Sequence, residues 1–217
     1  MPKLILIRHG QSVHNAGETV QGSDPDPTNI LSTVGKDQSF TFGHVLAQRR
    51  IAPACLWSSP LPRARQTGRI VAKAMKCRLP IQEDPRLREI CKGSRGLPGG
   101  LEGRRRDEAK TPPYREQYQR LGWDFRHGSL ESGGETAREA GRRFLTVLSM
   151  IADGLADDAT GLVFAHGQVI RYGIGAAWGF PDLKKIDASF RLGNCESLIV
   201  VRSPQRIWRL VGRMASA

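Results

Sequence analysis

The sequence predicts an α/β protein, a three-layer α/β/α sandwich with a mostly parallel central sheet. Short apolar runs alternate along the 217 residues with longer segments of helical periodicity, an order typical of α/β proteins. The runs at residues 3–7, 55–57 and 161–165 are apolar almost throughout, which indicates strands that are covered on both faces, as in parallel sheets. In such sheets, ligands bind beyond the carboxyl ends of the strands.

Local signals place the remaining elements. Ser32 is a favourable N-cap residue for the first long helix, and Ile70, Val71 and Ala74 share one face of the second. The predicted helices cover residues 32–49, 63–75, 134–152 and 168–178, and two late strands cover residues 197–201 and 207–211.

Residues 91–134 interrupt this alternation. They are rich in Gly, Pro and Arg and too long for an ordinary connection. We expect a lid-like insertion into a single domain that spans residues 1–217, partly helical near residues 104–110 and 115–121. A disordered surface loop is the alternative, against which the aromatic residues of this stretch argue: Tyr114, Tyr118, Trp123 and Phe125.

The chain is strongly basic, with a formal charge of +12 from 33 Lys and Arg against 21 Asp and Glu. Such a charge attracts anions, among them nucleic acids and phosphorylated metabolites. However, the densest run, residues 104–106, is followed at once by Asp107 and Glu108, and acids weaken a field that attracts phosphate. We therefore expect a solvated face and no nucleic-acid partner.

The four cysteines are widely spaced, and the chain has no CxxC pair and no HExxH motif, so neither a metal site nor a cofactor is expected. No segment has the roughly 18 consecutive apolar residues of a membrane helix, and the apolar run at residues 4–7 is too short for a signal-peptide core. These observations predict a cytoplasmic protein with reduced thiols. They leave a homodimer open.

A polar motif follows the first predicted strand directly: Arg8, His9 and Gly10, then Gln11-Ser12 and Asn15. It resembles the RHGxSxxN signature of the histidine phosphatase superfamily, which includes the cofactor-dependent phosphoglycerate mutases. Three later stretches are similar to further blocks of that family and occur in the same order, namely SSPLPRARQTG (58–68), RLREI (86–90) and FAHG (164–167). The resemblance implies a phosphoglycerate mutase-like fold.

The resemblance also implies a set of catalytic residues. His9 is the expected nucleophile, and Arg8, Arg63 and His166 are expected to surround the phosphoryl group that it receives. Glu89, from the RLREI block, is the expected proton donor. Another branch of the superfamily takes this donor from just after the second histidine, where the present chain has no carboxylate.

These residue types suit phosphoryl transfer, which needs a nucleophile, positive charge around the phosphoryl oxygens and an acid for the leaving oxygen. A neutral imidazole attacks phosphorus to give a phosphohistidine, which water then hydrolyses. The planar guanidinium of arginine meets phosphate oxygens in pairs and stays charged. We expect the backbone N–H groups of Gly10 and Gly167 to add donors.

Five further residues are expected to border a small phosphorylated substrate: Asn15, Gln21, Gly22, Gly167 and Gln168. Gln168 stands where mutases of the family carry an asparagine, and the stretch GLEGRRRDEA resembles the G-x-x-E-G stretch of its phosphatases. These departures favour a phosphomonoester hydrolase over a mutase. A non-catalytic phospho-ligand or protein-binding module on the same fold is the alternative from another class.

Each residue also has a plainer interpretation when taken alone. His9 and His166 would be structural histidines, Arg63 a surface residue at a helix start, and Glu89 an exposed acid paired with Arg86 or Arg88. The other histidines are interpreted as structural or exposed: His14, His44 and His127. The agreement of four separate blocks favours the catalytic interpretation.

Overall fold

The computed structural model describes residues 1–93, 100–105, 107, 133–179 and 190–215. Six strands of the described chain form one sheet. They are β1 (Lys3–Arg8), β2 (Pro53–Ser58), β3 (Ile81–Glu83), β4 (Thr160–Ala165), β5 (Ser197–Arg202) and β6 (Trp208–Met214). The helices are α1 (Val13–Ala16), α2 (Thr33–Gln48), α3 (Pro62–Ala74), the short 3₁₀ helix η1 (Pro85–Leu87), α5 (Ala137–Asp153) and α6 (Gly167–Ala177).

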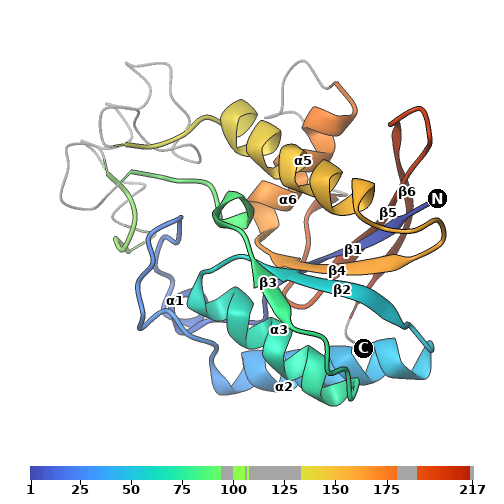
Figure 1. Ribbon diagram of the computed structural model, residues 1–217. Coiled ribbons are helices and arrows are strands. Elements are labelled where there is room, and N and C mark those ends of the chain that lie inside the picture. Colours follow the sequence, from blue (N-terminus) through green and yellow to red (C-terminus); the bar gives the residue numbers. More distant parts are fainter. Residues whose placement is uncertain (94–99, 106, 108–132, 180–189, 216–217) are drawn as a thin grey trace.

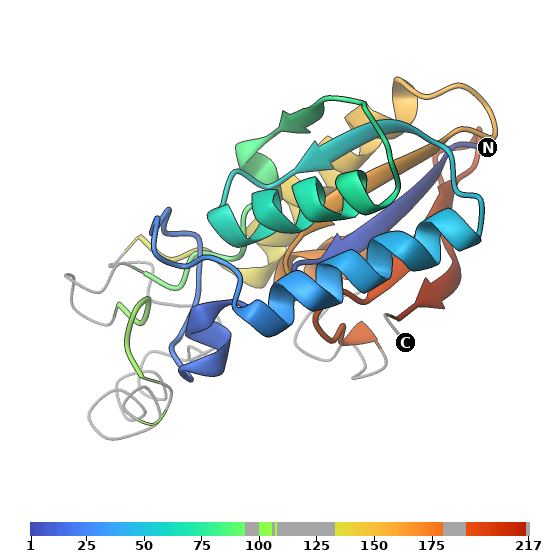
Figure 2. The same cartoon turned by 90° about the horizontal axis from the view of Figure 1, so that it is seen from below.

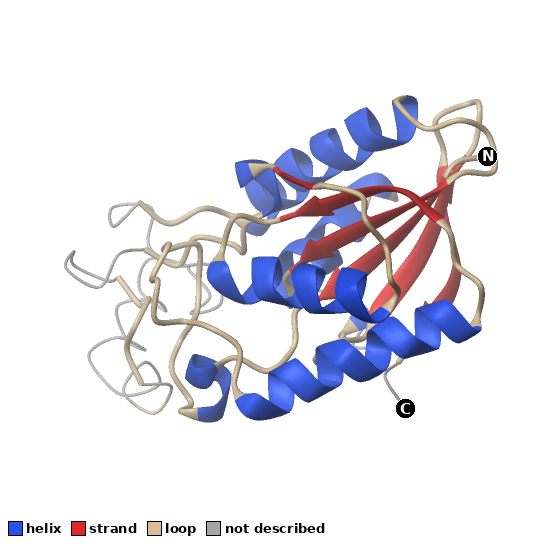
Figure 3. Cartoon of the chain, turned by 60° about the horizontal axis from the view of Figure 1, so that its bottom comes forward, coloured by secondary structure: helices blue, strands red, loops and turns tan. Residues whose placement is uncertain are grey.

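The strand order is β3-β2-β4-β1-β5-β6. The first four strands in this order are parallel, whereas β5 pairs antiparallel with β1 and with β6. Their register places Arg8 beside Ala165 and Ser58 beside Phe164. The carboxyl ends of β1, β2 and β4 therefore meet at one edge, and in Figure 3 these strands point toward the loops.

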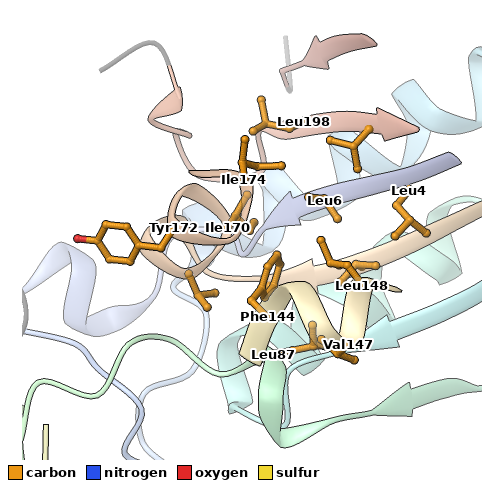
Figure 4. Packing of buried hydrophobic residues seen from close by; sticks show 14 of the residues in the cluster. Leu4, Leu6, Leu87, Phe144, Val147, Leu148, Ile170, Tyr172, Ile174 and Leu198 are labelled. Atoms are coloured by element: carbon orange, nitrogen blue, oxygen red, sulfur yellow. The ribbon is translucent and has the colours of Figure 1, made fainter. Parts of the chain in front are cut away.

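Helices cover both faces of the sheet, with α5 and α6 on one side and α2 and α3 on the other (Figures 1 and 2). The side chains of β1 alternate between the two layers. Leu4 and Leu6 belong to the core beneath α5 and α6, together with Phe144 (Figure 4). Ile5 and Ile7 belong to the core beneath α2 and α3. The predicted α/β/α sandwich is confirmed, since the apolar strand runs serve two cores.

Helix α6 packs closely against α5. A Cβ atom added at Gly173 would lie 2.3 Å from Cδ1 of Phe144, and one at Gly141 would lie 2.6 Å from the carbonyl oxygen of Tyr172. Because β4 leads directly into α6, this packing fixes the start of α6 at the carboxyl edge of the sheet. None of the described helices is long and apolar enough to cross a membrane.

The expected elements are confirmed within a few residues, including Ser32 as N-cap of α2, where its side chain accepts from Gly35 N–H. The short strand β3 was not predicted. One expectation was wrong: Arg104 and Arg105 do not begin a helix. Their backbone pairs with the loop at residues 19–20, where Val20 N–H donates to the Arg104 carbonyl at 2.8 Å and Arg105 bridges Thr19. Residues 106 and 108–110 of this expected helix, and the helix expected near residues 115–121, lie outside the described residues, so the lid-like insertion at residues 91–134 stays a prediction.

Candidate active site

His9 lies just beyond the carboxyl end of β1 and is 3% exposed. Its Nδ1 atom lies 2.7 Å from the carbonyl oxygen of Gly10. A carbonyl oxygen only accepts, so Nδ1 carries the proton of the neutral ring and Nε2 presents its lone pair. The structure therefore orients Nε2 as the basic atom of this side chain.

Arg63 lies in the first turn of α3 and is 1% exposed. Its Nε donates to Nε2 of His9 at 3.2 Å, and its Nη2 donates to the carbonyl oxygen of Gly22 at 3.0 Å. Its Nη1 is buried and has no hydrogen-bond partner among the described residues. A buried donor without a partner is costly, so Nη1 is available to a further acceptor.

His166 follows β4, is fully buried and is the N-cap residue of α6. Its Nε2 lies 2.9 Å from Oγ of Ser59, and Ser59 Oγ also accepts from Leu61 N–H at 3.3 Å. With the Ser59 hydroxyl as donor to Nε2, the imidazole proton is on Nδ1. Nδ1 is buried and, like Nη1 of Arg63, has no hydrogen-bond partner among the described residues.

The two imidazole rings lie together, with 5.1 Å between their centroids and 62° between their planes. Burial lowers the pKa of His9 well below its ordinary value of 6.5, and the charges of Arg63 and Arg8 lower it further. Burial and the charge of Arg63 act in the same direction on the pKa of His166. Both rings are therefore neutral near pH 7. Burial also lowers the pKa of Arg63 to about 10, so its guanidinium remains charged.

Glu89 lies on the loop after η1 and is 7% exposed. Its carboxylate accepts from the backbone N–H groups of Ile90 at 3.0 Å, Val169 at 2.9 Å and Gln168 at 3.3 Å. The last two belong to the first turn of α6, where a negative charge is favoured. The plainer interpretation of Glu89 is thus wrong: Arg86 pairs with Asp84 instead, and Glu89 is buried.

Arg8 and Gly167 also lie at this edge. Arg8 ends β1, and its Nη1 donates to the Leu192 carbonyl at 2.5 Å. A Cβ atom added at Gly167 would lie 3.3 Å from Cδ of Arg8. The expectation for Gly10 was wrong, however. Its N–H donates to Oγ1 of Thr67 at 3.0 Å, so it is already committed to α3.

Some of the residues expected to border the substrate contact the catalytic candidates, whereas others bond elsewhere. The Gly22 carbonyl contacts Arg63 directly, whereas Gln168 contacts Glu89 through its backbone. Asn15 closes a capping box with Ser12 at the start of α1, and Gln21 Nε2 donates to Oγ of Ser12 at 3.0 Å. Asn15 and Gln21 are thus engaged with α1.

Glu102 is a buried residue that we did not predict for the site. Its carboxylate accepts from the N–H groups of Ser23 at 2.9 Å, Lys92 at 2.8 Å and Asp24 at 2.8 Å. A Cβ atom at Gly22 would lie 1.8 Å from Oε1 of Glu102, so a side chain there would displace the Glu102 carboxylate. Glu102 therefore holds the loop whose carbonyl binds Arg63. Its position in the G-x-x-E-G-like stretch was the only signal for it.

Comparison with known families agrees with this geometry. The family model of the histidine phosphatase superfamily (branch 1) matches residues 4–213. The chain belongs to this superfamily. The superfamily includes phosphatases and mutases, and proteins of both kinds are similar to this chain.

The chain is 31% identical over 197 residues to a probable phosphoglycerate mutase GpmB of Yersinia enterocolitica, a match that covers 90% of this chain and 82% of the relative. A mycobacterial glucosyl-3-phosphoglycerate phosphatase, solved with VO3, has a TM-score of 0.73 at 23% identity and 96% coverage of both chains. A putative alpha-ribazole-5'-P phosphatase from Escherichia coli has a TM-score of 0.78 at 22% identity, covering 100% of this chain and 98% of that one. At such identities the two structures show the shared fold.

Proposed function

We propose that this protein is a phosphomonoester hydrolase that acts on a small phosphorylated substrate through a phosphohistidine at His9. The observation that carries the proposal is a pair of buried nitrogen atoms without partners among the described residues, Nη1 of Arg63 and Nδ1 of His166, in the site that holds the Nε2 lone pair of His9. A phosphoryl group beside His9 would accept from both donors. The site thus offers a nucleophile and charge stabilisation together.

In the first step, Nε2 of His9 forms a bond to phosphorus while the bond from phosphorus to the leaving oxygen breaks. The electron pair of that bond goes to the leaving oxygen, which takes a proton from Glu89. Arg63 Nε releases Nε2 of His9 and turns toward the phosphoryl oxygens. The lowered pKa of His9 keeps its ring neutral and nucleophilic below pH 7.

In the second step, a water molecule attacks phosphorus, its proton goes to Glu89, and the bond to Nε2 breaks. Inorganic phosphate leaves and His9 is restored. Oε2 of Glu89 serves both transfers, because it accepts the longest of the three hydrogen bonds, from Gln168 N–H at 3.3 Å, whereas Oε1 accepts the other two.

A phosphoglycerate mutase is the second candidate, and the name of the relatives at 30–31% identity favours it. A mutase returns the phosphoryl group to a second hydroxyl of a small carboxylate-bearing substrate. The glutamine at position 168, in place of the asparagine of mutases, is the residue that favours hydrolysis.

One experiment separates these candidates. Phosphate release is measured across sugar phosphates, phosphoglycerates, nucleotides and phosphoamino acids, with 3-phosphoglycerate isomerisation assayed in parallel on the same preparation. We expect phosphate release to exceed isomerisation for at least one substrate. Isomerisation faster than every hydrolysis would establish the mutase instead, and neither activity would favour the non-catalytic module.

A further inference from the structure

Arg143 on α5 reaches the loop that carries Glu89. Its Nη1 donates to the carbonyl oxygens of Arg86 at 2.6 Å and Arg88 at 2.8 Å. Its Nη2 donates to the carbonyl oxygen of Glu89 itself at 3.0 Å. One guanidinium thus fixes three carbonyls within four successive residues of the chain.

Glu135 completes this arrangement from the other side. Nε of Arg143 donates to Oε2 of Glu135 at 2.9 Å, and Nη2 pairs with Oε1. The same Oε1 accepts from Cys91 N–H at 2.9 Å, while Glu135 N–H donates to the Cys91 carbonyl at 3.0 Å. The two side chains, 23% and 19% exposed, therefore hold the main chain on both sides of Glu89.

This hold matters because residues 88–93 belong to no helix or strand. A residue in a sheet receives its position from the ladder of its neighbours, but Glu89 does not. Its carboxylate is held by α6, as described above, and its main chain by Arg143. Charge-assisted hydrogen bonds of this kind are stronger than neutral ones and carry more directional information.

We propose that Arg143 and Glu135 are positioning residues for proton transfer by Glu89. The inference rests on the proposed function, in which Glu89 protonates the leaving oxygen. Neither residue contacts the reacting atoms; each acts through the backbone at residues 86–91. Their loss must therefore impair proton donation to the leaving oxygen and leave the nucleophile His9 unaffected.

The leaving group of the substrate distinguishes the contribution of the acid, Glu89, from that of the nucleophile, His9. p-Nitrophenolate departs without a proton, whereas the alkoxide of propyl phosphate needs one. For Arg143→Lys, we expect kcat/KM to fall about tenfold to hundredfold with propyl phosphate and less than about threefold with p-nitrophenyl phosphate, since a positioned acid contributes roughly 10²–10⁴-fold. Lysine keeps the charge but cannot donate to three carbonyls and a carboxylate together.

Glu135→Gln is the second variant, in case Arg143→Lys fails to fold, and thermal unfolding is recorded for both. Arg142→Lys is the matched control, because Arg142 is the exposed neighbour on the same helix; we expect it to change neither rate. Combining Arg143→Lys with Glu89→Gln should add no further loss with propyl phosphate beyond Glu89→Gln alone, because the two residues act as a unit.

Equal losses with the two substrates would overturn the proposal, because Arg143 would then support the fold only. Full activity of both folded variants with propyl phosphate would overturn it as well. If Glu89→Gln lowered kcat/KM equally with both substrates, Glu89 would not be the acid, and the proposal for Arg143 and Glu135 would fail with it. Failure of the proposed function is a different result, in which the unaltered protein releases phosphate from neither substrate.

Discussion

The floor of the site, which we define as His9, Arg63 and His166, is carried by β1, α3 and the junction of β4 with α6. The rim, which we define as Glu89 and the loop at residues 21–24, is carried by chain without regular structure. Regular structure holds the floor, whereas side chains hold the rim: Arg143 and Glu135 for the main chain around Glu89, and Glu102 for the loop.

The difference separates two kinds of contribution to one reaction. The floor supplies the groups that contact phosphorus and its oxygens in the proposed mechanism, and its side chains are 0–3% exposed. The rim supplies the acid and a carbonyl that orients Arg63. Substitutions in the floor should therefore abolish the chemistry, while those that loosen the rim should reduce it by degrees.

The largest effect is expected for His9→Ala. Loss of the nucleophile should lower kcat by about 10⁴-fold or more, because the remaining groups cannot form a covalent intermediate. Turnover of p-nitrophenyl phosphate measures it. His44→Ala is the matched control, since this histidine is exposed and meets Phe40 edge-on. A His9→Ala variant with a tenth of the original rate would show that the floor is not the centre of reaction.

Arg63→Lys should have the next largest effect. Lysine cannot serve His9, the Gly22 carbonyl and a phosphoryl oxygen at once, so we expect kcat/KM to fall about 10²–10³-fold. Inhibition by inorganic phosphate should weaken in parallel. Arg65→Lys provides the control two residues along α3, where Arg65 pairs with Glu83 near the surface. Unchanged phosphate inhibition in Arg63→Lys would contradict the assignment of Nη1 to the anion.

Glu102→Gln tests the rim and should act more mildly. In the original protein, three N–H groups donate to the two carboxylate oxygens of Glu102. The amide of glutamine has only one oxygen, so one N–H group loses its acceptor at a cost of about 1–3 kcal/mol. We expect a lower free energy of unfolding in urea and a kcat/KM reduced by about tenfold. Asp107→Asn, an exposed neighbour that pairs with Arg105, should change neither. A loss as large as that of His9→Ala would erase the distinction between floor and rim.

The smallest effect concerns stability against pH. Because the fold lowers the pKa of His9 and His166 below 6.5, the unfolded chain binds protons below that pH that the folded chain does not. The free energy of unfolding should thus fall as the pH drops below about 6.5, by up to about 1.4 kcal/mol per pH unit for each histidine. His166→Gln should reduce the slope measured by urea denaturation. An unchanged slope would mean that the buried ring is protonated in the fold.

The sequence predicts the floor better than the rim, for a physical reason. His9 and His166 directly follow apolar strand runs, and Arg63 opens a helix that directly follows another. The meeting of their side chains thus needs only the rule that parallel strands end at one edge. Glu102 binds a loop 79 residues away, at Ser23, and Arg143 binds Glu89 over 54 residues. No periodicity predicts such bonds from side chain to backbone, and the G-x-x-E-G-like stretch was the only local signal for Glu102.

Arg105 shows that long-range hydrogen bonds can also overrule a structure that the local sequence predicts. Its arginine-rich, acid-flanked surroundings are compatible with a helix, yet the backbone at residues 103–105 pairs with residues 19–20. The pairing draws this stretch beside the loop that Glu102 holds. Tertiary hydrogen bonds outweighed a local preference of a few tenths of a kcal/mol per residue.

The most direct test of the central claim is to trap the intermediate. The protein is mixed with phosphorus-32-labelled substrate, quenched within milliseconds in base, and the labelled peptide is sequenced. We expect a base-stable, acid-labile phosphate on the Nε2 atom of His9, because Nδ1 donates to the Gly10 carbonyl. Phosphate on a serine, on Nδ1 of His9, or on no residue during full turnover would contradict it.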